Sequence, residues 1–254
     1  MNPILSKVSI GTWITLGHPA IAEIFSDAGF DWLAVDLEHS SITLREAEDL
    51  IRVIDLKGLV PFVRLSANNA EQIKRVMDAG AHGVIVPMVN DAKQATAAVD
   101  AVKYPPVGKR SFGLARAQGY GEAFEKYREW QVDHSVVVVQ IEHIDAVNNL
   151  DDILSVDGVD AYFVGPYDLS GSLGIPGQFD HPDFLEAIEK IKEVGVASGI
   201  PGGRHVIEPE PELLKAALNA GDRFIAYSLD SRMLATSAQG GMAVTKADDR
   251  NIRP

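Results

Sequence analysis

The sequence predicts a single (β/α)₈ TIM barrel, the α/β fold in which eight parallel strands alternate with helices. Three observations predict it: the length, a recurring unit of helix, glycine and strand, and the polar residues that follow several strands. With 254 residues, the chain has the usual size of eight βα units in one domain. Because 46% of the residues are hydrophobic, it can bury a large core. We expect residues 1–254 to form one domain, with a short C-terminal tail from about residue 240.

The recurring unit places a glycine at the end of a helix and a short apolar run a few residues later. Glycine supplies the left-handed conformation that ends a helix, and a continuous apolar run is typical of a strand buried on both faces. The four copies predict strands at Trp32–Asp36, Gly83–Pro87, Ala161–Gly165 and Phe224–Ser228. Strands separated in this way by helices pair in parallel.

Four further runs bring the number of predicted strands to eight. They are Ser9–Ile14, Val60–Arg64, Val136–Glu142 and Ile200–Gly202. Thr43 and Glu46 form a capping box that opens one of the intervening helices. No Gly-x-Gly-x-x-Gly motif follows the first strand, which disfavours an open dinucleotide-binding sheet. The long segment Lys103–Tyr120 interrupts the pattern, and we expect an insertion in a βα loop, where barrels place specificity elements.

Charge and composition exclude several classes of function. The formal net charge of −13 argues against binding to nucleic acid or to an anionic membrane. There are no cysteines, so disulfides, thiolate catalysis and Cys-based metal sites are excluded. The sequence has neither a signal-peptide pattern nor an apolar stretch long enough to span a membrane. These observations predict a cytoplasmic protein that acts on small molecules.

Polar residues follow the predicted strands at the end where a barrel carries its chemistry. They are Asp36, Glu38 and His39 after the second strand, Arg64 after the third, Gln140 and Glu142 at the fifth and Asp168 after the sixth. Gln140 and Glu142 are two residues apart, so their side chains point the same way. Glu142 and Asp168 come from adjacent strands, and their carboxylates suit a hard divalent ion such as Mg²⁺ or Mn²⁺.

Five stretches in a fixed order make the sequence resemble a known family. They are Val35–His39, Pro61–Arg64, Tyr104–Arg110, Gln140–Glu142 and Phe163–Ser170. Together they resemble the HpcH/HpaI aldolases, class II pyruvate aldolases that act on 4-hydroxy-2-oxo acids. The likeness runs from about Gly11 to Asp230, and the order of the motifs is far more specific than any one of them.

The resemblance implies a barrel of the phosphoenolpyruvate/pyruvate type and a role for each site residue. Glu142 and Asp168 would bind Mg²⁺ or Mn²⁺, or alternatively Co²⁺. The remaining roles are substrate contact by Gln140 and by Gly165, Pro166, Tyr167 and Asp168, acid–base catalysis by His39, and charge stabilisation by Arg64. The backbone amides of Tyr167 and Asp168 would hold the pyruvate carboxylate. The resemblance also implies a homo-oligomer, a hexamer, in which the helix near Asp230–Leu234 packs on a neighbour.

The residue that orients His39 stays open at this point. Local spacing favours Asp36, three residues earlier, whereas the resemblance points to Asp78. A carboxylate at a helix C-terminus is disfavoured by the helix dipole, so Asp78 invites a functional reason such as delivery across a subunit interface. A solvated helix end is the other interpretation of Asp78. If Asp78 serves His39, Asp36 is free to act on a metal-bound water.

Other functions remain as alternatives. A Claisen-type lyase or synthase, or an oxaloacetate decarboxylase, would use the same enolate. A coenzyme A substrate needs a basic patch, and only Lys103, Lys109, Arg110 and Arg116 cluster in the sequence. A barrel that binds a keto acid without catalysis is the third possibility. A Schiff-base aldolase is disfavoured because no lysine ends a predicted strand. His18 and His205 are expected in loops that border the substrate's distal end.

Overall fold

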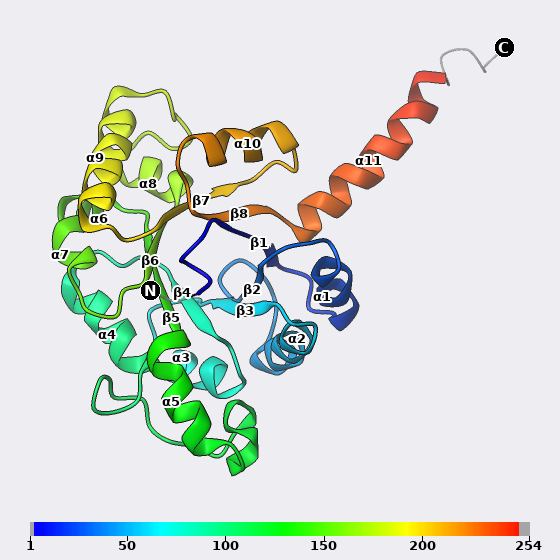
Figure 1. The fold of residues 1–254 in the computed structure, drawn as a ribbon. Helices are drawn as coiled ribbons and strands as arrows, with labels where there is room; N and C mark the ends of the chain where they lie inside the picture. Colours follow the sequence, from blue (N-terminus) through cyan, green and yellow to red (C-terminus); the bar gives the residue numbers. More distant parts are fainter. Residues whose placement is uncertain (1–2, 249–254) are drawn as a thin grey trace.

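The computed structural model describes residues 3–248 and shows a closed barrel of eight parallel strands (Figure 1). The strands pair in chain order, and β1 closes the barrel by pairing with β8. They are β1 (Ser9–Ile14), β2 (Trp32–Asp36), β3 (Val60–Arg64), β4 (Gly83–Val86), β5 (Val136–Ile141), β6 (Ala161–Val164), β7 (Gly202–Val206) and β8 (Phe224–Leu229). The predicted fold class is therefore confirmed.

Helices cover the outside of the barrel, and most of them connect consecutive strands (Figure 1). They are α1 (Pro19–Ser26), α2 (Leu44–Leu56), α3 (Ala70–Asp78), α4 (Ala92–Val102), the 3₁₀ helix η1 (Arg116–Gly121), α5 (Phe124–His134), α6 (Ile144–Asn148), α7 (Leu150–Leu154), α8 (Pro166–Ser172), α9 (Pro182–Ser198), α10 (Pro211–Asn219) and α11 (Asp230–Asp248). The predicted capping box of Thr43 and Glu46 opens α2.

Apolar residues on the two faces of the strands form separate cores inside and outside the barrel. Alternate strand residues point inward and form a small core rich in aromatic rings, including Trp13, Trp32, Phe62 and Phe224. The residues between them point outward and pack beneath the helices. Gly11 makes room for the inner rings, because a Cβ at this position would lie 2.0 Å from the Trp32 ring. The period-two alternation thus lets each strand be buried on both faces.

Two predicted features differ from the structure. The seventh strand begins at Gly202 and not at Ile200, so Gly203, Arg204 and His205 lie in β7 and not in a loop. Glycines have weak strand propensity, which hid this strand in the sequence. The segment Lys103–Tyr120 follows α4 and precedes α5 and β5, so it is an αβ connection. It therefore lies at the N-terminal end of the barrel, away from the end where a βα loop would lie.

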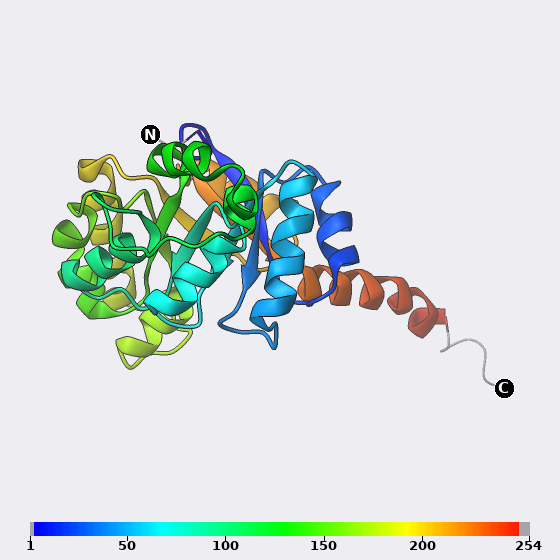
Figure 2. The ribbon, with the colours of Figure 1, turned by 90° about the horizontal axis from the view of Figure 1, so that it is seen from below.

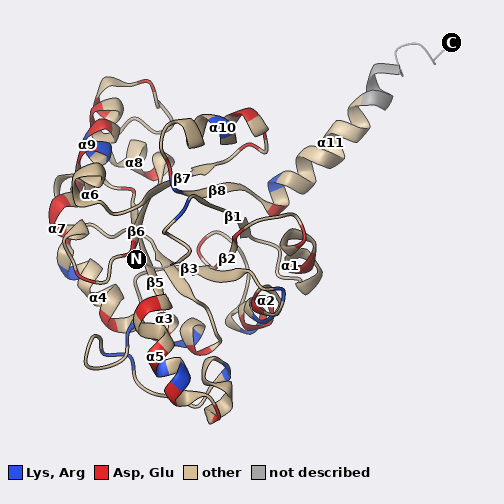
Figure 3. Ribbon diagram, viewed as in Figure 1, with Lys and Arg blue, Asp and Glu red and all other residues tan. Residues whose placement is uncertain are grey.

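The last helix, α11, extends away from the barrel (Figures 1 and 2). Residues from about 240, expected as a tail, are helical as far as Asp248. Acidic and basic residues are interspersed over the outer helices (Figure 3). Among the residues that the structure describes, no helix is long and apolar enough to cross a membrane.

Candidate active site

A cavity of about 270 Å³ opens at the C-terminal end of the barrel strands. It is lined by all but one of the residues predicted for catalysis, substrate and metal: Asp36, His39, Arg64, Gln140, Glu142, Gly165, Pro166, Tyr167 and Asp168. The exception is Asp78. Trp13, Thr15 and His205 also line this cavity. These side chains come together because they lie at or just after the C-terminal ends of β2, β3, β5 and β6, and parallel strands in a closed barrel all end on the same face.

A larger cavity of about 520 Å³ lies between β6 and β7 and the helices α9 and α10. Its wall is mostly apolar and includes Phe179, Phe184 and Ile188. It shares Tyr167 and His205 with the smaller cavity but is lined by none of the site's carboxylates. Size alone would select it, but the convergent charged groups assign the chemistry to the smaller cavity.

Asp36 and Arg64 form a bidentate ion pair at the base of this cavity. The two residues are register partners on β2 and β3. Arg64 donates from Nε and Nη2 to the two Asp36 oxygens, at 2.9 and 2.6 Å. Burial raises the pKa of Asp36, but the hydrogen bonds and charge of Arg64 outweigh it and hold the pKa below 3.8. The guanidinium also lies 4.3 Å from the centre of the Trp13 ring.

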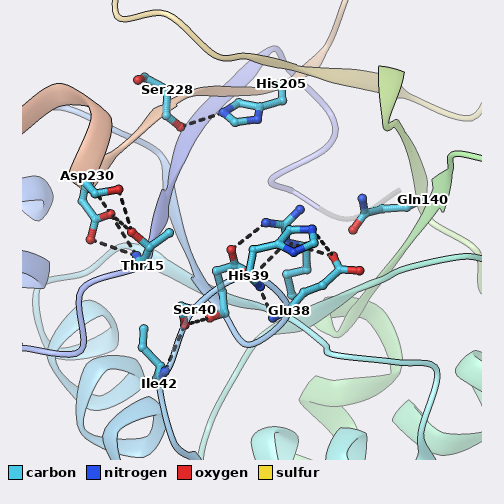
Figure 4. A network of polar contacts seen from close by, with 12 residues as sticks. Thr15, Glu38, His39, Ser40, Ile42, Gln140, His205, Ser228 and Asp230 are labelled. Carbon is cyan, nitrogen blue, oxygen red and sulfur yellow. Dashed lines mark hydrogen bonds and ion pairs between the residues drawn. The ribbon is translucent and has the colours of Figure 1, made fainter. Parts of the chain in front are cut away.

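The loop after β2 is built on the same carboxylate. The backbone amides of Glu38 and His39 donate to Asp36 Oδ1, at 3.0 and 3.3 Å. Asp36 thus fixes the backbone of His39, whereas the nearest carboxylate to its ring is that of Glu38, 3.6 Å from Nε2 (Figure 4). Glu38 also lies 3.5 Å from Arg64 Nε. Sequence reasoning did not assign Glu38 a role, although it stands inside the motif.

Asp78 lies at the other end of the barrel within the same chain. It ends α3 just before β4 begins, and its carboxylate is 3.9 Å from buried Arg110 Nε. Burial raises the pKa of Asp78 despite this neighbour. A single chain therefore does not bring Asp78 to His39, and Asp36 is occupied by Arg64. In one chain, neither predicted partner contacts the His39 ring.

Glu142 is the most deeply buried carboxylate of the cavity apart from Asp36, with 3% of its surface exposed. The Met88 amide donates to Oε1 at 2.6 Å, and Gln140 Nε2 donates to Oε2 at 2.9 Å. Gln140 and Glu142 thus share a direction, as predicted. Burial, with the charges of Glu38 and Asp168, raises the pKa of Glu142 to about 7.

Gly165 gives the Glu142 carboxylate its space. A Cβ at this position would lie 2.6 Å from Glu142 Oε2, closer than any ordinary contact. Gly165 also precedes α8, whose first turn carries Tyr167 and Asp168. The glycine therefore lets the β6 end approach Glu142, which places Asp168 within electrostatic reach of it.

The oxygen-rich donor set fits a hard divalent cation. A buried carboxylate beside two others carries negative charge that its amide hydrogen bonds do not neutralise. The oxygens Gln140 Oε1 and Glu38 Oε2 are buried without a hydrogen bond. In the described part of the chain, no three His, Cys, Asp or Glu side chains form a preformed metal cage. Two carboxylates leave coordination positions for substrate and water, as catalytic magnesium sites do.

Five of the seven histidines fall into two groups by position. His39 and His205 line the cavity. His18, His143 and His181 cap the N-termini of α1, α6 and α9 through their ring nitrogens. His18, a candidate for the distal end of the substrate, does not line this cavity. His205 reaches it from within β7, an inward strand position that a loop assignment could not predict.

The predicted basic cluster is not a surface patch. Lys103 and Arg110 are buried, at 5% and 2% exposure. Lys109 pairs with Asp100, and Arg116 pairs with Asp55. All four lie at or near the αβ connection before β5, away from the cavity. No lysine lines the cavity in the described part of the chain.

We expect Asp36→Asn to lower the free energy of unfolding by roughly 3 kcal/mol at pH 7, because Arg64 would stay buried without its partner. The pKa of Asp36 is lower in the folded state than its value of 3.8 when unperturbed. Its carboxylate therefore contributes stability above pH 3.8, and this contribution is lost as the pH falls further. Urea unfolding at pH 7 and at pH 3 measures the difference, which should shrink at the lower pH.

Asp27→Asn is the matched control. Asp27 pairs with Lys57 at 2.8 Å, but 71% of its side chain is exposed. Exposed pairs contribute about 1 kcal/mol or less. Equal decreases in the free energy of unfolding of the two variants would show that the Asp36–Arg64 pair contributes no more to stability than an exposed ion pair.

Comparisons with known proteins agree with this geometry. The family model HpcH/HpaI aldolase/citrate lyase matches residues 9–237. A hydroxypyruvate/pyruvate aldolase of Sagittula stellata is 39% identical over 234 residues, covering 90% of each chain. A 4-hydroxy-2-oxo-heptane-1,7-dioate aldolase of Shigella sonnei is 37% identical, covering 98% of this chain and 94% of the relative.

A solved structure is also closely similar. The crystal structure of an HpcH/HpaI aldolase from Desulfitobacterium hafniense superposes with a TM-score of 0.87 at 32% identity, covering 96% of this chain and 95% of the other. The matched residues include every strand and every residue that lines the cavity. The chain is an enzyme of the HpcH/HpaI aldolase/citrate lyase family.

Proposed function

We propose that this enzyme is a divalent-metal-dependent class II aldolase that reversibly cleaves a 4-hydroxy-2-oxo acid into pyruvate and an aldehyde. The observation that carries the proposal is the buried Glu142 carboxylate, which faces a cavity shared with Asp168, His39 and Arg64. The Shigella sonnei relative is named for a 4-hydroxy-2-oxo acid, and the Sagittula stellata relative is named for hydroxypyruvate and pyruvate.

Glu142 and Asp168 would hold the ion, which we propose to be Mg²⁺ or Mn²⁺, with Co²⁺ as a further candidate. When bound, the ion supplies Lewis-acid withdrawal of electrons from the 2-oxo group of pyruvate. Gln140 then contacts the oxo acid beside Glu142. The first-turn amides of Tyr167 and Asp168 receive its carboxylate, because N–H groups at a helix start favour an anion.

His39 and Arg64 would handle the proton and the charge at the aldehyde. In cleavage, His39 takes the proton from the 4-hydroxyl as the bond between C3 and C4 breaks, and in synthesis it returns the proton. Arg64 stabilises the negative charge that develops on the aldehyde oxygen. Asp36 fixes both groups, through the guanidinium of one and the backbone amide of the other. Glu38 lies beside both of them, 3.6 Å from His39 Nε2 and 3.5 Å from Arg64 Nε.

Two alternatives are weaker. A Claisen-type enzyme with a coenzyme A substrate would need basic groups at the cavity, and the four candidates lie elsewhere in buried or paired positions. An oxaloacetate decarboxylase would use the same carboxylates, and it is distinguished from an aldolase because it releases carbon dioxide and not an aldehyde. A barrel that only binds a keto acid leaves His39 without a role.

One prediction of this proposal concerns the methyl protons of pyruvate. With Mg²⁺ or Mn²⁺ present, the enzyme should exchange them with D₂O, seen as loss of the methyl signal in proton NMR. A chelator should stop the exchange. Glu142→Gln and Gly165→Ala should each lower it at least tenfold, one by removing charge and the other because its Cβ displaces the carboxylate.

Gly171→Ala is the control for this experiment. It adds the same methyl group within α8, where nothing lies within 4 Å of a Cβ. Exchange in this variant should stay within about twofold of the wild type. Undiminished exchange and aldol turnover in chelator, with no metal bound, would refute the proposed chemistry.

The second prediction concerns His39. His39→Ala should lower kcat for aldol turnover by roughly 10²–10⁴-fold, the effect of losing a general acid–base group. Metal content and unfolding should stay close to those of the wild type, because 63% of the His39 side chain is exposed. His18→Ala, which removes a helix cap outside the cavity, is the control. A wild-type kcat and pH profile in His39→Ala would remove His39 from the mechanism.

We further propose that the enzyme is a homo-hexamer in which Asp78 of one subunit serves His39 of another. The projecting α11, with Leu234 60% exposed, supports contact with a neighbour. His39→Ala and Asp78→Asn should each be poorly active alone. Mixed after reversible dissociation, they should regain activity, because a site can combine His39 from one chain with Asp78 from the other. A monomeric enzyme, or no recovery in confirmed mixed oligomers, would overturn this arrangement.

A further inference from the structure

His205 stands out among the cavity residues because the proposed reaction does not use it. It lies at an inward position of β7 and lines the wall beside Trp13, with ring centroids 5.9 Å apart. Trp13 carries the Arg64 guanidinium on its face, so His205, Trp13 and Arg64 form one continuous part of the wall. Because Arg64 is proposed to act on the aldehyde oxygen, His205 lies on the same part of the wall as that group.

The backbone of Ser228 fixes the orientation of the His205 ring. His205 Nε2 lies 3.1 Å from the Ser228 carbonyl oxygen (Figure 4). Ser228 has a φ of 55°, a left-handed conformation that is strained for a residue with a side chain. Thr12 Oγ1 donates to the same carbonyl at 3.1 Å. This carbonyl is thus held in place from two strands while it receives the imidazole.

This contact also fixes the tautomer. A carbonyl oxygen can only accept, so Nε2 must carry the proton. Burial, with the positive charge of Arg64, lowers the pKa of His205 to about 4, so the ring is neutral at physiological pH. Nδ1 then holds a lone pair, and in the described part of the chain it makes no hydrogen bond. The wall therefore presents one neutral, oriented acceptor.

Resting on the proposed function, we infer that His205 is a specificity-determining residue whose Nδ1 accepts a hydrogen bond from a hydroxyl group of the substrate. A neutral acceptor matches a hydroxyl, and its lone pair opposes a carboxylate at the same position. The other polar side chain on this part of the wall, Thr15, already donates to Asp230 at 2.6 Å.

Two classes of substrate carry such a hydroxyl. One is an aldehyde with a hydroxyl beside its carbonyl group, and the other is a 2-oxo acid with a hydroxyl on its methyl carbon. Both would place one donor next to the carbons that react. The preference would be for hydroxylated over plain substrates of otherwise similar size.

The test compares matched substrates in wild type and His205→Leu. One arm pairs glycolaldehyde with acetaldehyde, using pyruvate as the oxo acid. The second arm pairs hydroxypyruvate with pyruvate, using acetaldehyde. In at least one arm, the ratio of kcat/KM for the hydroxylated over the plain substrate should fall about tenfold or more in the variant, as expected for one lost hydrogen bond. The arm that changes identifies the source of the hydroxyl.

His205→Gln provides a second variant, because its amide keeps one donor for Ser228 and one acceptor. It should retain more of the preference than His205→Leu. His18→Leu, outside the cavity, should leave both ratios as in the wild type. Nitrogen-15 NMR of the His205 ring adds a readout independent of turnover, and it should show Nδ1 unprotonated. Adding the hydroxylated compound from the arm whose kcat/KM ratio changed should shift the Nδ1 signal. Adding the plain compound of the same arm should not shift it.

The outcomes separate this inference from the proposed function. Unchanged ratios in both arms, or a protonated Nδ1 at pH 7.5, would overturn the role of His205 and leave the aldolase standing. No aldol product from any pair in the wild type would overturn both.

Discussion

The bidentate pair of Asp36 and Arg64 is the contact on which the rest of the site depends. The strand register makes the two residues neighbours, with 1% of the Asp36 side chain and 14% of the Arg64 side chain exposed. The carboxylate accepts four hydrogen bonds, two from the guanidinium and one each from the backbone amides of Glu38 and His39. One carboxylate therefore orients both the cation and the loop that carries the histidine. A buried ion pair of this kind is more valuable for geometry than for net stability.

Strained backbone serves the same purpose on the other two sides of the cavity. Met88 and Ser228 have φ angles of 53° and 55°, and each uses a main-chain group to hold a site residue. The Met88 amide donates to Glu142, and the Ser228 carbonyl receives His205. Each such conformation costs about 1–3 kcal/mol, which the surrounding barrel must supply. Main-chain groups do not swing between rotamers, so they position their partners more firmly than side chains would.

The sequence predicted most of this arrangement because strand ends are readable from local patterns. Apolar runs bounded by glycines predicted the strands, and the polar residues after them converge because parallel strands end together. The features that the sequence did not predict depend on three-dimensional contacts between distant residues and not on local sequence patterns. The predicted bounds of β7 were wrong because Gly202 and Gly203 have weak strand propensity. Glycine is needed at position 203 because the strands β7 and β8 approach closely there, and a Cβ on Gly203 would lie 1.8 Å from the Phe224 carbonyl oxygen. The hydrogen bond from the Met88 amide to Glu142 joins residues 54 positions apart, so no local pattern predicts it.

The two halves of the cavity differ in electrostatic character, and this difference bears on specificity. On one side Glu38, Glu142 and Asp168 gather negative charge that a cation would balance. On the other, Trp13 and a neutral His205 present a polarisable face and a single acceptor. In the proposed function, a metal and an oxo-acid carboxylate would bind at the first side through strong electrostatic interactions. The second side offers a hydrogen-bond acceptor and apolar contact, and these are the interactions that would discriminate between partner substrates. It follows that the chemistry of such a site constrains the charged half, while the choice of partner substrate is open to change at β7 without disturbing the carboxylates.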